Sequence, residues 1–273
     1  MIWDLGEKKL ELETESLVIG ILNATPDSFS DGGKFAGFEK MITHGFAMFA
    51  QGAALVDVGG ESTRPGAAEV PAEVEIARVE PVVRALVAEG LVSIDTSKAE
   101  VARAALEAGA CVVNDVTGLR DEKMVALCVE KNCGVVVMHM QGDPRSMQRE
   151  PNYVDVVAEV REFFENRLEF LMAAGIAAER ICFDPGIGFG KKFEHNLALL
   201  RGLRDLKVGG RPILLGVSRK SFFGEILGSA EMADRSWPTV AVTAWSHGKG
   251  VRLHRVHEVK GNVEALRVLR NVE

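Results

Sequence analysis

The amino-acid sequence predicts an α/β protein folded as a single (β/α)8 (TIM) barrel. Eight short runs rich in Val, Ile and Leu alternate with amphipathic stretches, and such continuous apolar runs are typical of parallel strands buried on both faces. The chain of 273 residues is also close to the roughly 250 residues of this architecture. A doubly wound open sheet stays an alternative, because periodicity alone does not show that a sheet closes. The eight runs are 17–22, 54–59, 91–95, 111–115, 134–139, 181–184, 213–217 and 251–256.

The elements around these strands follow from the same kind of pattern. Residues 1–16 precede the first run and predict a short hairpin that covers the bottom of the barrel. Stretches 72–90, 98–109 and 156–175 have apolar residues three and four apart and end at glycine, as amphipathic helices do. Pro81 lies inside the first of them and predicts a kink. No linker or composition shift marks a second domain, so we expect residues 1–273 to form one domain.

Composition narrows the class of function. The net charge of −7 argues against a general binder of nucleic acid or of anionic membranes, which needs a basic face. No apolar run reaches the roughly 18 residues of a membrane span, and the charged N-terminal segment does not resemble a signal peptide. The four cysteines form no CxxC pair. We therefore expect a cytoplasmic protein that acts on small molecules.

Polar residues follow nearly every predicted strand. In a barrel the carboxyl ends of all strands meet on one face, where active sites lie. Turn chemistry accounts for Asn and Asp at such positions but not for Arg, Lys and His, so we predict one shared site at this end. The strand-end residues are Asn23, the segment 59–64, Asp95, Asn114 with Asp115, His139, Asp184, Ser218 with Lys220, and Arg255 with His257.

The segment "VGGESTRPGA" (58–67) ends the second strand in an unusual way. Two glycines let the chain leave the strand with dihedral angles that other residues rarely adopt, and they leave room for a ligand. Pro65 fixes its own φ and restricts Arg64 to an extended conformation. We expect this loop to hold a hydroxyl and a guanidinium over whatever binds at the mouth.

The first loop, "NATPDSFSDGGKF" (23–35), has a similar character. Asn23 ends the strand, and two aspartates and a glycine pair follow. Asn and Asp oxygens suit a hard cation such as Mg²⁺, which prefers phosphate oxygens as its other partners. A flexible polar turn is the competing interpretation.

Asp95 and Asp184 each end a predicted strand with a carboxylate, and Asn114 places an amide at the end of another. Together they could exchange hydrogen bonds with a flat nitrogen heterocycle that carries amino and NH groups. An acid/base pair of the glycosidase type is an alternative, and Asp95, followed by "TSK", also fits a helix N-cap.

Basic residues predict an anion site on the last two strands. "GVSRKSFF" (216–223) places Lys220 and Ser221 where a strand becomes a helix, and a helix N-terminus offers free N–H groups. In "HRVH" (254–257), Arg255 and His257 share one face of the strand and His254 points the other way. Arg255 and His257 therefore fit a phosphate clamp better than a zinc pair.

These motifs resemble those of the dihydropteroate synthase family, the pterin-binding folate-pathway enzymes that sulfonamides inhibit. The resemblance runs in family order from residue 18 to residue 259. It rests on "GILNATPDSFSDGG", "VDVGGESTRPGA", "SIDTSK", "VNDVTG", "MHMQGDPRSMQ", "FDPGIGFGK", "GVSRKS" and "RVHEV". It implies that the amine of 4-aminobenzoate attacks the methylene of 6-hydroxymethyl-7,8-dihydropterin diphosphate, with Mg²⁺ as cofactor and diphosphate as leaving group.

The resemblance also implies a role for each matching residue. The pterin would lie against Asp95, Asn114, Met138, Asp184, Gly216 and Lys220; the diphosphate against Asn23, Arg64, Arg255 and His257; the aminobenzoate against Phe29, Thr63, Pro65, Phe189 and Ser221; and Mg²⁺ against Asn23 and Asp31. The catalytic set would be Asp95, Asp184, Lys220, Arg255 and His257.

Some expectations go beyond individual contacts. An aromatic amine needs no strong base, so we expect dissociative substitution in which the C–O bond breaks early. Loops 23–37 and 59–71 would then close over the ligands and exclude water. The family implies a homodimer, although "RSWPTVAVTAWSHGKG" (235–250) and Glu258 depart from its pattern.

Three alternatives share part of these features. A methyltetrahydrofolate:corrinoid methyltransferase has a similar fold and binds a pterin, but does not need Arg64, Arg255 and His257, because no diphosphate leaves. A pterin-binding protein without catalysis and a generic sugar-phosphate barrel enzyme are the other two.

Overall fold

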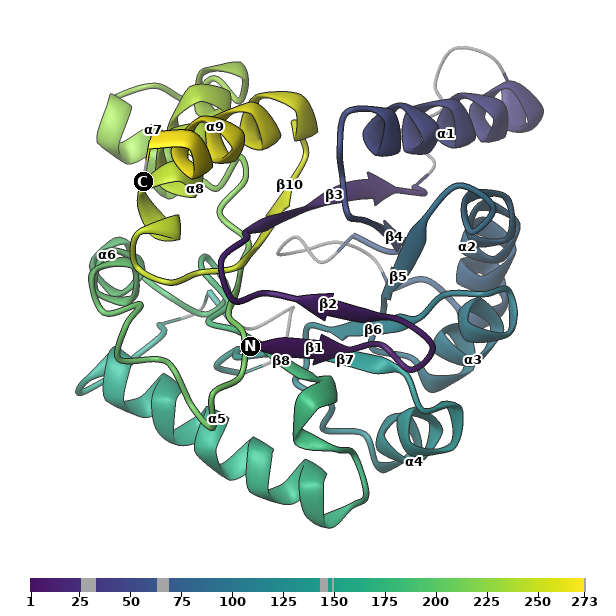
Figure 1. Ribbon diagram of the computed structural model, residues 1–273, viewed down its shortest axis with the longest axis horizontal. Helices are drawn as coiled ribbons and strands as arrows, with labels where there is room; N and C mark the ends of the chain where they lie inside the picture. Colours follow the sequence, from purple (N-terminus) through teal and green to yellow (C-terminus); the bar gives the residue numbers. More distant parts are fainter. Residues whose placement is uncertain (26–32, 63–68, 143–146, 149, 273) are drawn as a thin grey trace.

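Eight parallel strands form a ring that is surrounded by helices (Figure 1). The computed structural model describes residues 1–25, 33–62, 69–142, 147–148 and 150–272. The ring contains β3 (Leu17–Asn23), β4 (Leu55–Gly59), β5 (Leu91–Asp95), β6 (Val112–Asp115), β7 (Gly134–Met138), β8 (Ile181–Asp184), β9 (Leu214–Leu215) and β10 (Leu253–Val256). All eight coincide with predicted strands, and β9 differs most from its prediction because only its two central residues pair as a strand.

The order of the strands confirms the predicted barrel. They pair as β8-β7-β6-β5-β4-β3-β10-β9, and a parallel bridge between Phe183 and Ile213 joins the two ends of this sheet. The N–H of Phe183 donates to the carbonyl of Pro212 at 3.0 Å at the same junction. The sheet therefore closes, which excludes the doubly wound alternative.

The helices follow the strands around the outside of the ring. They are α1 (Gly33–Ala50), α2 (Ala72–Leu86), α3 (Ala99–Glu107), α4 (Glu122–Lys131), α5 (Val156–Ala173), α6 (Phe193–Arg201), α7 (Phe222–Leu227), α8 (Ser236–His247) and α9 (Val259–Val272), with 3-10 turns η2 (Ala178–Arg180) and η3 (Ala233–Arg235). None of the helices within the described residues is long and apolar enough to cross a membrane.

Capping residues and prolines explain where several helices begin and end. The Asp155 carboxylate accepts the N–H groups of Val157 and Ala158 at the start of α5, and Asp121 does the same for Lys123 at the start of α4. Helix α2 continues through Pro81 and ends at Leu86, four residues before the predicted end. Pro238 lies in the first turn of α8, where its missing N–H breaks no helical hydrogen bond.

The N-terminal hairpin covers one end of the barrel, as predicted. Strands β1 (Ile2–Asp4) and β2 (Lys9–Glu11) pair in antiparallel fashion and lie across the middle of the ring (Figure 1). Trp3, Leu5 and Leu12 are buried, and they form a cluster with inward-facing residues near the amino ends of the strands. The indole Nε1 of Trp3 donates to the carbonyl of Arg180 at 2.8 Å. The hairpin therefore blocks this end and leaves the opposite face as the open mouth.

The register of the strands lines up the predicted polar residues at that mouth. Asn23 pairs with Gly59, Gly59 with Asp95, and Asp95 with Asn114. Met138 pairs with Asp184 further round the ring. Residues from four neighbouring strands thus stand in one row, because each strand ends at the same level.

Candidate active site

A guanidinium held by two carboxylates lies inside the mouth. Arg255 on β10 donates from Nε to Oδ2 of Asp57 at 2.5 Å and from Nη2 to Oδ2 of Asp95 at 2.5 Å. The side chain of Asp57 is 1% exposed, that of Asp95 is 13% exposed and that of Arg255 is 20% exposed. Because such pairs are stable in a low-dielectric interior only with good geometry, this cluster fixes the positions of three strands relative to one another.

Asp57 organises this cluster, and sequence reasoning missed it. Its Oδ2 also accepts from Asn114 Nδ2 at 2.9 Å, and its Oδ1 accepts from the hydroxyl of Ser93. Asp57 was overlooked because it lies in the middle of the apolar run 54–59 rather than at its end. A single charge inside a run buried on both faces needs a partner, and this is the signal that could have revealed it.

Burial changes the protonation of the cluster. The pKa of Asp95 is raised to about 7, mainly by burial, against the opposing effect of the Arg255 guanidinium. Burial alone lowers the pKa of Arg255, but the carboxylates of Asp57 and Asp95 raise it overall, so Arg255 stays charged. The mouth therefore holds a fixed cation beside a carboxyl group that titrates near neutral pH.

Asp184 lies in the same basin. Its side chain is buried, its Oδ1 accepts the N–H of Gly186 at 2.7 Å, and its carbonyl accepts the N–H of His139 at 2.9 Å. Burial raises its pKa, whereas the Gly186 hydrogen bond and the charges of Lys220 and Arg255 lower it. Lys220, in the loop after β9, and Arg255, on β10, are thus close enough to Asp184 to act on its charge.

The residues around Asp184 leave space for a flat ligand. A Cβ atom on Gly216 would lie 3.5 Å from Oδ2 of Asp184, and no other atom of the described residues would lie within 4 Å of it apart from the adjacent backbone. Nζ of Lys220 lies 4.0 Å from the centroid of the Phe189 ring, a cation–π arrangement. Met138 is buried in a small apolar cluster against which Phe189 packs. Five predicted site residues from three segments therefore lie close together.

Lys191 and His139 form a buried pair beneath this loop. Lys191 is 3% exposed, and its ammonium donates to Nδ1 of His139 at 3.0 Å and to the carbonyl of Phe189 at 2.9 Å. Burial lowers the pKa of Lys191 to about 7 and that of His139 to about 2. The neutral His139 can thus accept from the lysine, which fastens the loop that carries Phe189. Neither pairing was predicted.

His257, Ser218 and Ser221 lie at the ends of the last two strands. Nδ1 of His257 and the hydroxyl of Ser218 are 2.9 Å apart, and the backbone N–H of His257 donates to the same hydroxyl at 3.1 Å. Ser221 is exposed and immediately precedes α7. Asp115, by contrast, accepts hydrogen bonds from Thr117 and Leu119 in its own turn, so it serves the local backbone and not the basin.

A second ion-pair network anchors the loop after β4. The carboxylate of Glu61 accepts the N–H of Val70 at 3.0 Å with one oxygen and the ammonium of Lys98 with the other. Lys98 also pairs with Glu75 at 2.6 Å, and Glu75 is fully buried. Gly60 is required here, because a Cβ atom would lie 2.7 Å from Glu75 Cγ. Glu61 therefore links both ends of the loop to the segment that follows Asp95.

Several predicted site residues lie outside the described part of the chain. These are Phe29, Asp31, Thr63, Arg64 and Pro65. Closure of loops 23–37 and 59–71, which contain them, stays a prediction. Asn23 is described, and it is exposed at the end of β3. No group of three or more His, Cys, Asp or Glu residues that could hold a metal ion occurs within the described residues.

Comparison with known proteins identifies the class to which this fold and site belong. The model of the pterin binding enzyme family matches residues 19–257, so the chain belongs to that family. Dihydropteroate synthase of Escherichia coli (strain K12) is 44% identical over 256 residues, which cover 92% of this chain and 90% of that protein.

Solved structures agree. Dihydropteroate synthase of Yersinia pestis, in complex with a sulfonamide drug, has a TM-score of 0.92 at 40% identity and covers 100% of this chain and 99% of that one. Dihydropteroate synthase of Xanthomonas albilineans in complex with 7,8-dihydropteroate has a TM-score of 0.90 at 40% identity. The match covers 100% of this chain and 98% of that one. The particular members of the family that this chain resembles throughout are therefore dihydropteroate synthases.

Proposed function

We propose that this protein condenses 6-hydroxymethyl-7,8-dihydropterin diphosphate with 4-aminobenzoate to give 7,8-dihydropteroate and diphosphate. The observation that carries the proposal is the arrangement of Arg255 against Asp95, with Asp184 and Lys220 in the same basin. Buried carboxyl groups suit the NH groups of a pterin, and cations suit its diphosphate. The relatives that match nearly the whole chain are dihydropteroate synthases.

The pterin ring is assigned to the deepest part of the basin. Asp95, Asn114 and Asp184 would bind the polar edge of the ring, Lys220 would donate to its carbonyl or ring nitrogen, and Gly216 would leave space for its face. Met138 would contact the ring from the wall. Support comes from the burial of Asn114 and Asp184, at 6% exposed each, because a buried polar edge selects strongly for a ligand that satisfies it.

The diphosphate is assigned to the outer part of the basin. Asn23, Arg64, Arg255 and His257 are its proposed partners. Arg255 has two carboxylate partners, so only its remaining N–H groups could turn toward a phosphate. Aminobenzoate is assigned to Phe29, Thr63, Pro65, Phe189 and Ser221, with its carboxylate beside the start of α7.

The proposed reaction is a dissociative substitution. The C–O bond to the diphosphate breaks, the pair of electrons leaves with the diphosphate, and the aromatic amine then forms the C–N bond and releases a proton. Asp95 and Asp184 would stabilise positive charge that develops on the pterin, while Lys220, Arg255 and His257 would stabilise the leaving group. No described residue is asked to act as a strong base.

Mg²⁺ is the proposed cofactor, held by Asn23 and Asp31. Asn23 is exposed at the end of β3, its amide oxygen is a ligand type that suits Mg²⁺, and Mg²⁺ commonly binds through one or two protein oxygens plus substrate phosphates. The chemistry of the donors therefore fits. When bound, the ion would neutralise charge on the diphosphate.

The test is direct detection of the product. Purified protein is mixed with both substrates, with and without Mg²⁺, and dihydropteroate is measured by mass spectrometry. We expect product only with both substrates, strong dependence on Mg²⁺, and a loss of at least 100-fold in Asp184→Asn, in line with the loss of a key electrostatic group. Asp155→Asn, which alters only the cap of α5, is the matched control. Cobalamin-dependent methyl transfer without product formation would favour the methyltransferase alternative.

We further propose a homodimer in the cytoplasm. Exposed apolar side chains occur close together in sequence on α7, η3 and α8, namely Ile226, Leu227, Met232, Trp237 and Trp245, and such residues often mark an interface. The four cysteines are free thiols, as is usual in a reducing compartment. Light scattering coupled to size exclusion, on the wild type and on Trp237→Ser, would test the dimer.

A further inference from the structure

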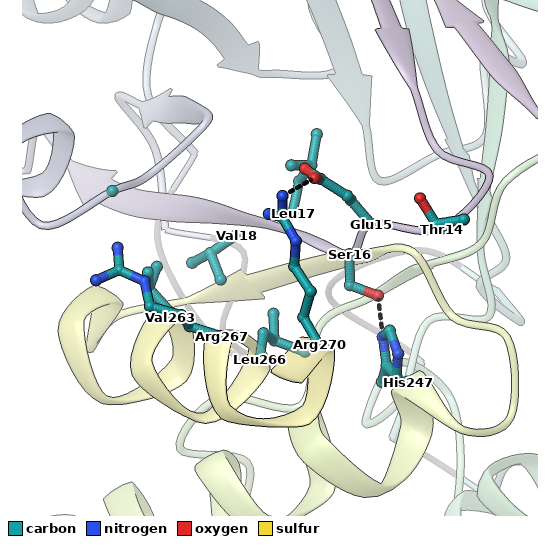
Figure 2. Close-up of a pocket in the computed structure, with 11 residues that line it drawn as sticks. Thr14, Glu15, Ser16, Leu17, Val18, His247, Val263, Leu266, Arg267 and Arg270 are labelled. Atoms are coloured by element: carbon teal, nitrogen blue, oxygen red, sulfur yellow. Dashed lines mark hydrogen bonds and ion pairs between the residues drawn. The ribbon is translucent and has the colours of Figure 1, made fainter. Parts of the chain in front are cut away.

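Two cavities lie at the amino end of the strands, away from the mouth. The first, about 170 Å³ in volume, lies between the start of β3 and helix α9, where Arg270 pairs with Glu15 at 2.7 Å and Ser16 contacts His247 (Figure 2). The second, about 400 Å³, is lined by Arg204, Lys207, His247, Gly248, Lys249, Gly250 and Arg252. His247 lines both cavities.

The lining of the second cavity contains four cationic side chains and no carboxylate. Asp and Glu are absent from its lining, although the protein as a whole carries a net charge of −7. Among the described ion pairs, none joins Arg204, Lys207, Lys249 or Arg252 to a carboxylate within 4 Å. Four like charges around one cavity repel one another, so this arrangement is stabilised when an anion enters.

Several of these cations are held in place by the backbone. Arg204 donates from Nη2 to the carbonyl of Gly248 at 3.0 Å. Arg252 donates from Nη1 to the carbonyls of His247 and Val251, both at 3.2 Å. Each guanidinium uses one terminal nitrogen in this way, and its other N–H groups have no acceptor among the described residues. The guanidinium groups of Arg204 and Arg252 are therefore held against the turn 247–252, and each keeps further N–H groups that can donate to a ligand.

The glycine at position 250 brings Lys207 into the cavity. Gly250 has φ of +85°, and a Cβ atom there would lie 2.3 Å from Nζ of Lys207. Only a residue without a side chain allows this approach. The hydroxyl of Ser16 donates to the carbonyl of Val251 at 2.9 Å and so accepts from Nδ1 of His247 at 2.8 Å, which fixes the ring of His247 at the wall.

His254 is a buried histidine next to the second cavity, and the charges around the cavity affect its pKa. His254, on the outward face of β10, is 1% exposed. Its pKa is lowered to about 3, first by burial and then by electrostatic interaction with His247 and Arg252. Nearby positive charge disfavours a protonated imidazole, which agrees with the cationic lining of the cavity.

We propose that the cavity lined by Arg204, Lys207, Lys249 and Arg252 binds a multivalent anion of the phosphate class, independently of the active site. The volume exceeds that of one phosphate group and accommodates a diphosphate or a phosphate ester. The cavity opens next to Arg252, which precedes β10, whereas the catalytic basin lies at the other end of this strand, at Arg255.

Calorimetric titration tests the proposal with three probes: inorganic phosphate, inorganic diphosphate and phenyl phosphate, all without Mg²⁺. The variant Lys207→Gln/Lys249→Gln removes two cations that make no hydrogen bond or ion pair with other described residues, although Lys249 Nζ also lies 5.3 Å from the centroid of the Trp245 ring. Lys8→Gln/Lys123→Gln, at two exposed lysines elsewhere, is the control for net charge. We expect the first variant to bind diphosphate at least tenfold more weakly at the cavity and the control to bind as the wild type does.

The proposed active site also binds diphosphate, so Lys220→Gln/His257→Gln, which leaves the buried ion pairs of Arg255 intact, is titrated as well. The proposal requires a binding event that persists in Lys220→Gln/His257→Gln and weakens in Lys207→Gln/Lys249→Gln. Equal affinity in wild type and Lys207→Gln/Lys249→Gln, or loss of all binding in Lys220→Gln/His257→Gln, overturns it. Preference for phenyl phosphate over the inorganic anions would identify an ester as the ligand. Dihydropteroate formation by Lys207→Gln/Lys249→Gln, expected at the wild-type rate, separates this site from the proposed function.

Discussion

Arg255 Nε lies 2.5 Å from Oδ2 of Asp57, although 198 positions separate the two residues in the sequence. This contact joins the last strand of the barrel to the second, and Asp95 extends it to the third. The two carboxyl groups share one cation, and Asp95, whose pKa is about 7, gains or loses its proton near neutral pH.

Removing the cation should destabilise the protein. Arg255→Met leaves Asp57 buried without its charged partner, and the loss of one member of a buried pair typically costs about 3–5 kcal/mol. We expect a loss of that size in the free energy of unfolding, measured by urea denaturation. The double variant Asp57→Asn/Arg255→Met should lose less than the single variant, because the uncompensated charge is gone. A double variant less stable than Arg255→Met would contradict this account.

The titration of Asp95 predicts a pH dependence of stability. Its folded-state pKa of about 7 exceeds the ordinary aspartate value of 3.8, so the folded state holds a proton that the unfolded chain releases. Asp95 thus favours folding in acid, and its contribution is lost as pH rises from about 4 to about 7. Unfolding free energies at several pH values should show this loss in the wild type and not in Asp95→Asn.

The same group should control pterin binding. An ionised carboxylate accepts two NH donors, so kcat/KM for the pterin substrate should rise with pH and level off near the pKa of about 7. Asp95→Asn should show a lower value without this inflection. A wild-type profile that is flat between about pH 5 and 8 would show that Asp95 does not titrate in the free enzyme.

The aromatic ring of Phe189 should affect binding of the pterin substrate, because it holds the ammonium of Lys220. Phe189→Leu removes the ring that lies 4.0 Å from the ammonium, an interaction worth about 0.5–2 kcal/mol. We expect KM for the pterin substrate to rise by about 2- to 30-fold, with a smaller change in kcat. Phe189→Tyr retains the ring and is the matched control. An equal effect in both variants would assign the loss to packing instead.

Glu61 should act on substrate binding through its two contacts. Glu61→Gln keeps an acceptor for the Val70 N–H but loses the charge that binds Lys98, whereas Glu61→Ala loses both. Hydrogen bonds to charged groups contribute about 1.5–3 kcal/mol, so Glu61→Ala should raise KM for aminobenzoate by about tenfold or more, and Glu61→Gln by less. Glu130→Gln, which weakens only surface ion pairs with Arg103 and Lys131, should have no effect. A KM unchanged in Glu61→Ala would remove Glu61 from any positioning role.

Much of the fold could be predicted because strand patterns are local. The Val residues of the run 134–139 are enough to indicate a buried strand. An Asp that precedes a helical pattern, as Asp155 precedes α5, is a typical N-cap. The convergence of Asp95, Asn114 and Asp184 at one end also followed, once a barrel was assumed, because the carboxyl ends of parallel strands meet on one face.

The partners of these residues could not be predicted. Arg255 looked like a free phosphate ligand, but it pairs with Asp57 and Asp95. Lys191 ends the motif "FDPGIGFGK", and nothing in that motif indicates that it is buried against His139. The sequence pattern indicates no role for His247, which lines both cavities at the barrel bottom. In each case the decisive contact joins positions that are distant along the chain.

The sequence alone therefore determined the eight strands and the family to which the motifs belong. It also showed that polar residues gather at the carboxyl ends of these strands. The tertiary structure decided which charges are paired, which carboxyl group titrates near neutral pH and where cations stay uncompensated. The physical reason is that the two kinds of interaction act over different separations along the chain. Apolar periodicity acts between residues a few positions apart, whereas ion pairing and burial depend on distances in space, which are set only when the barrel closes between Phe183 and Ile213.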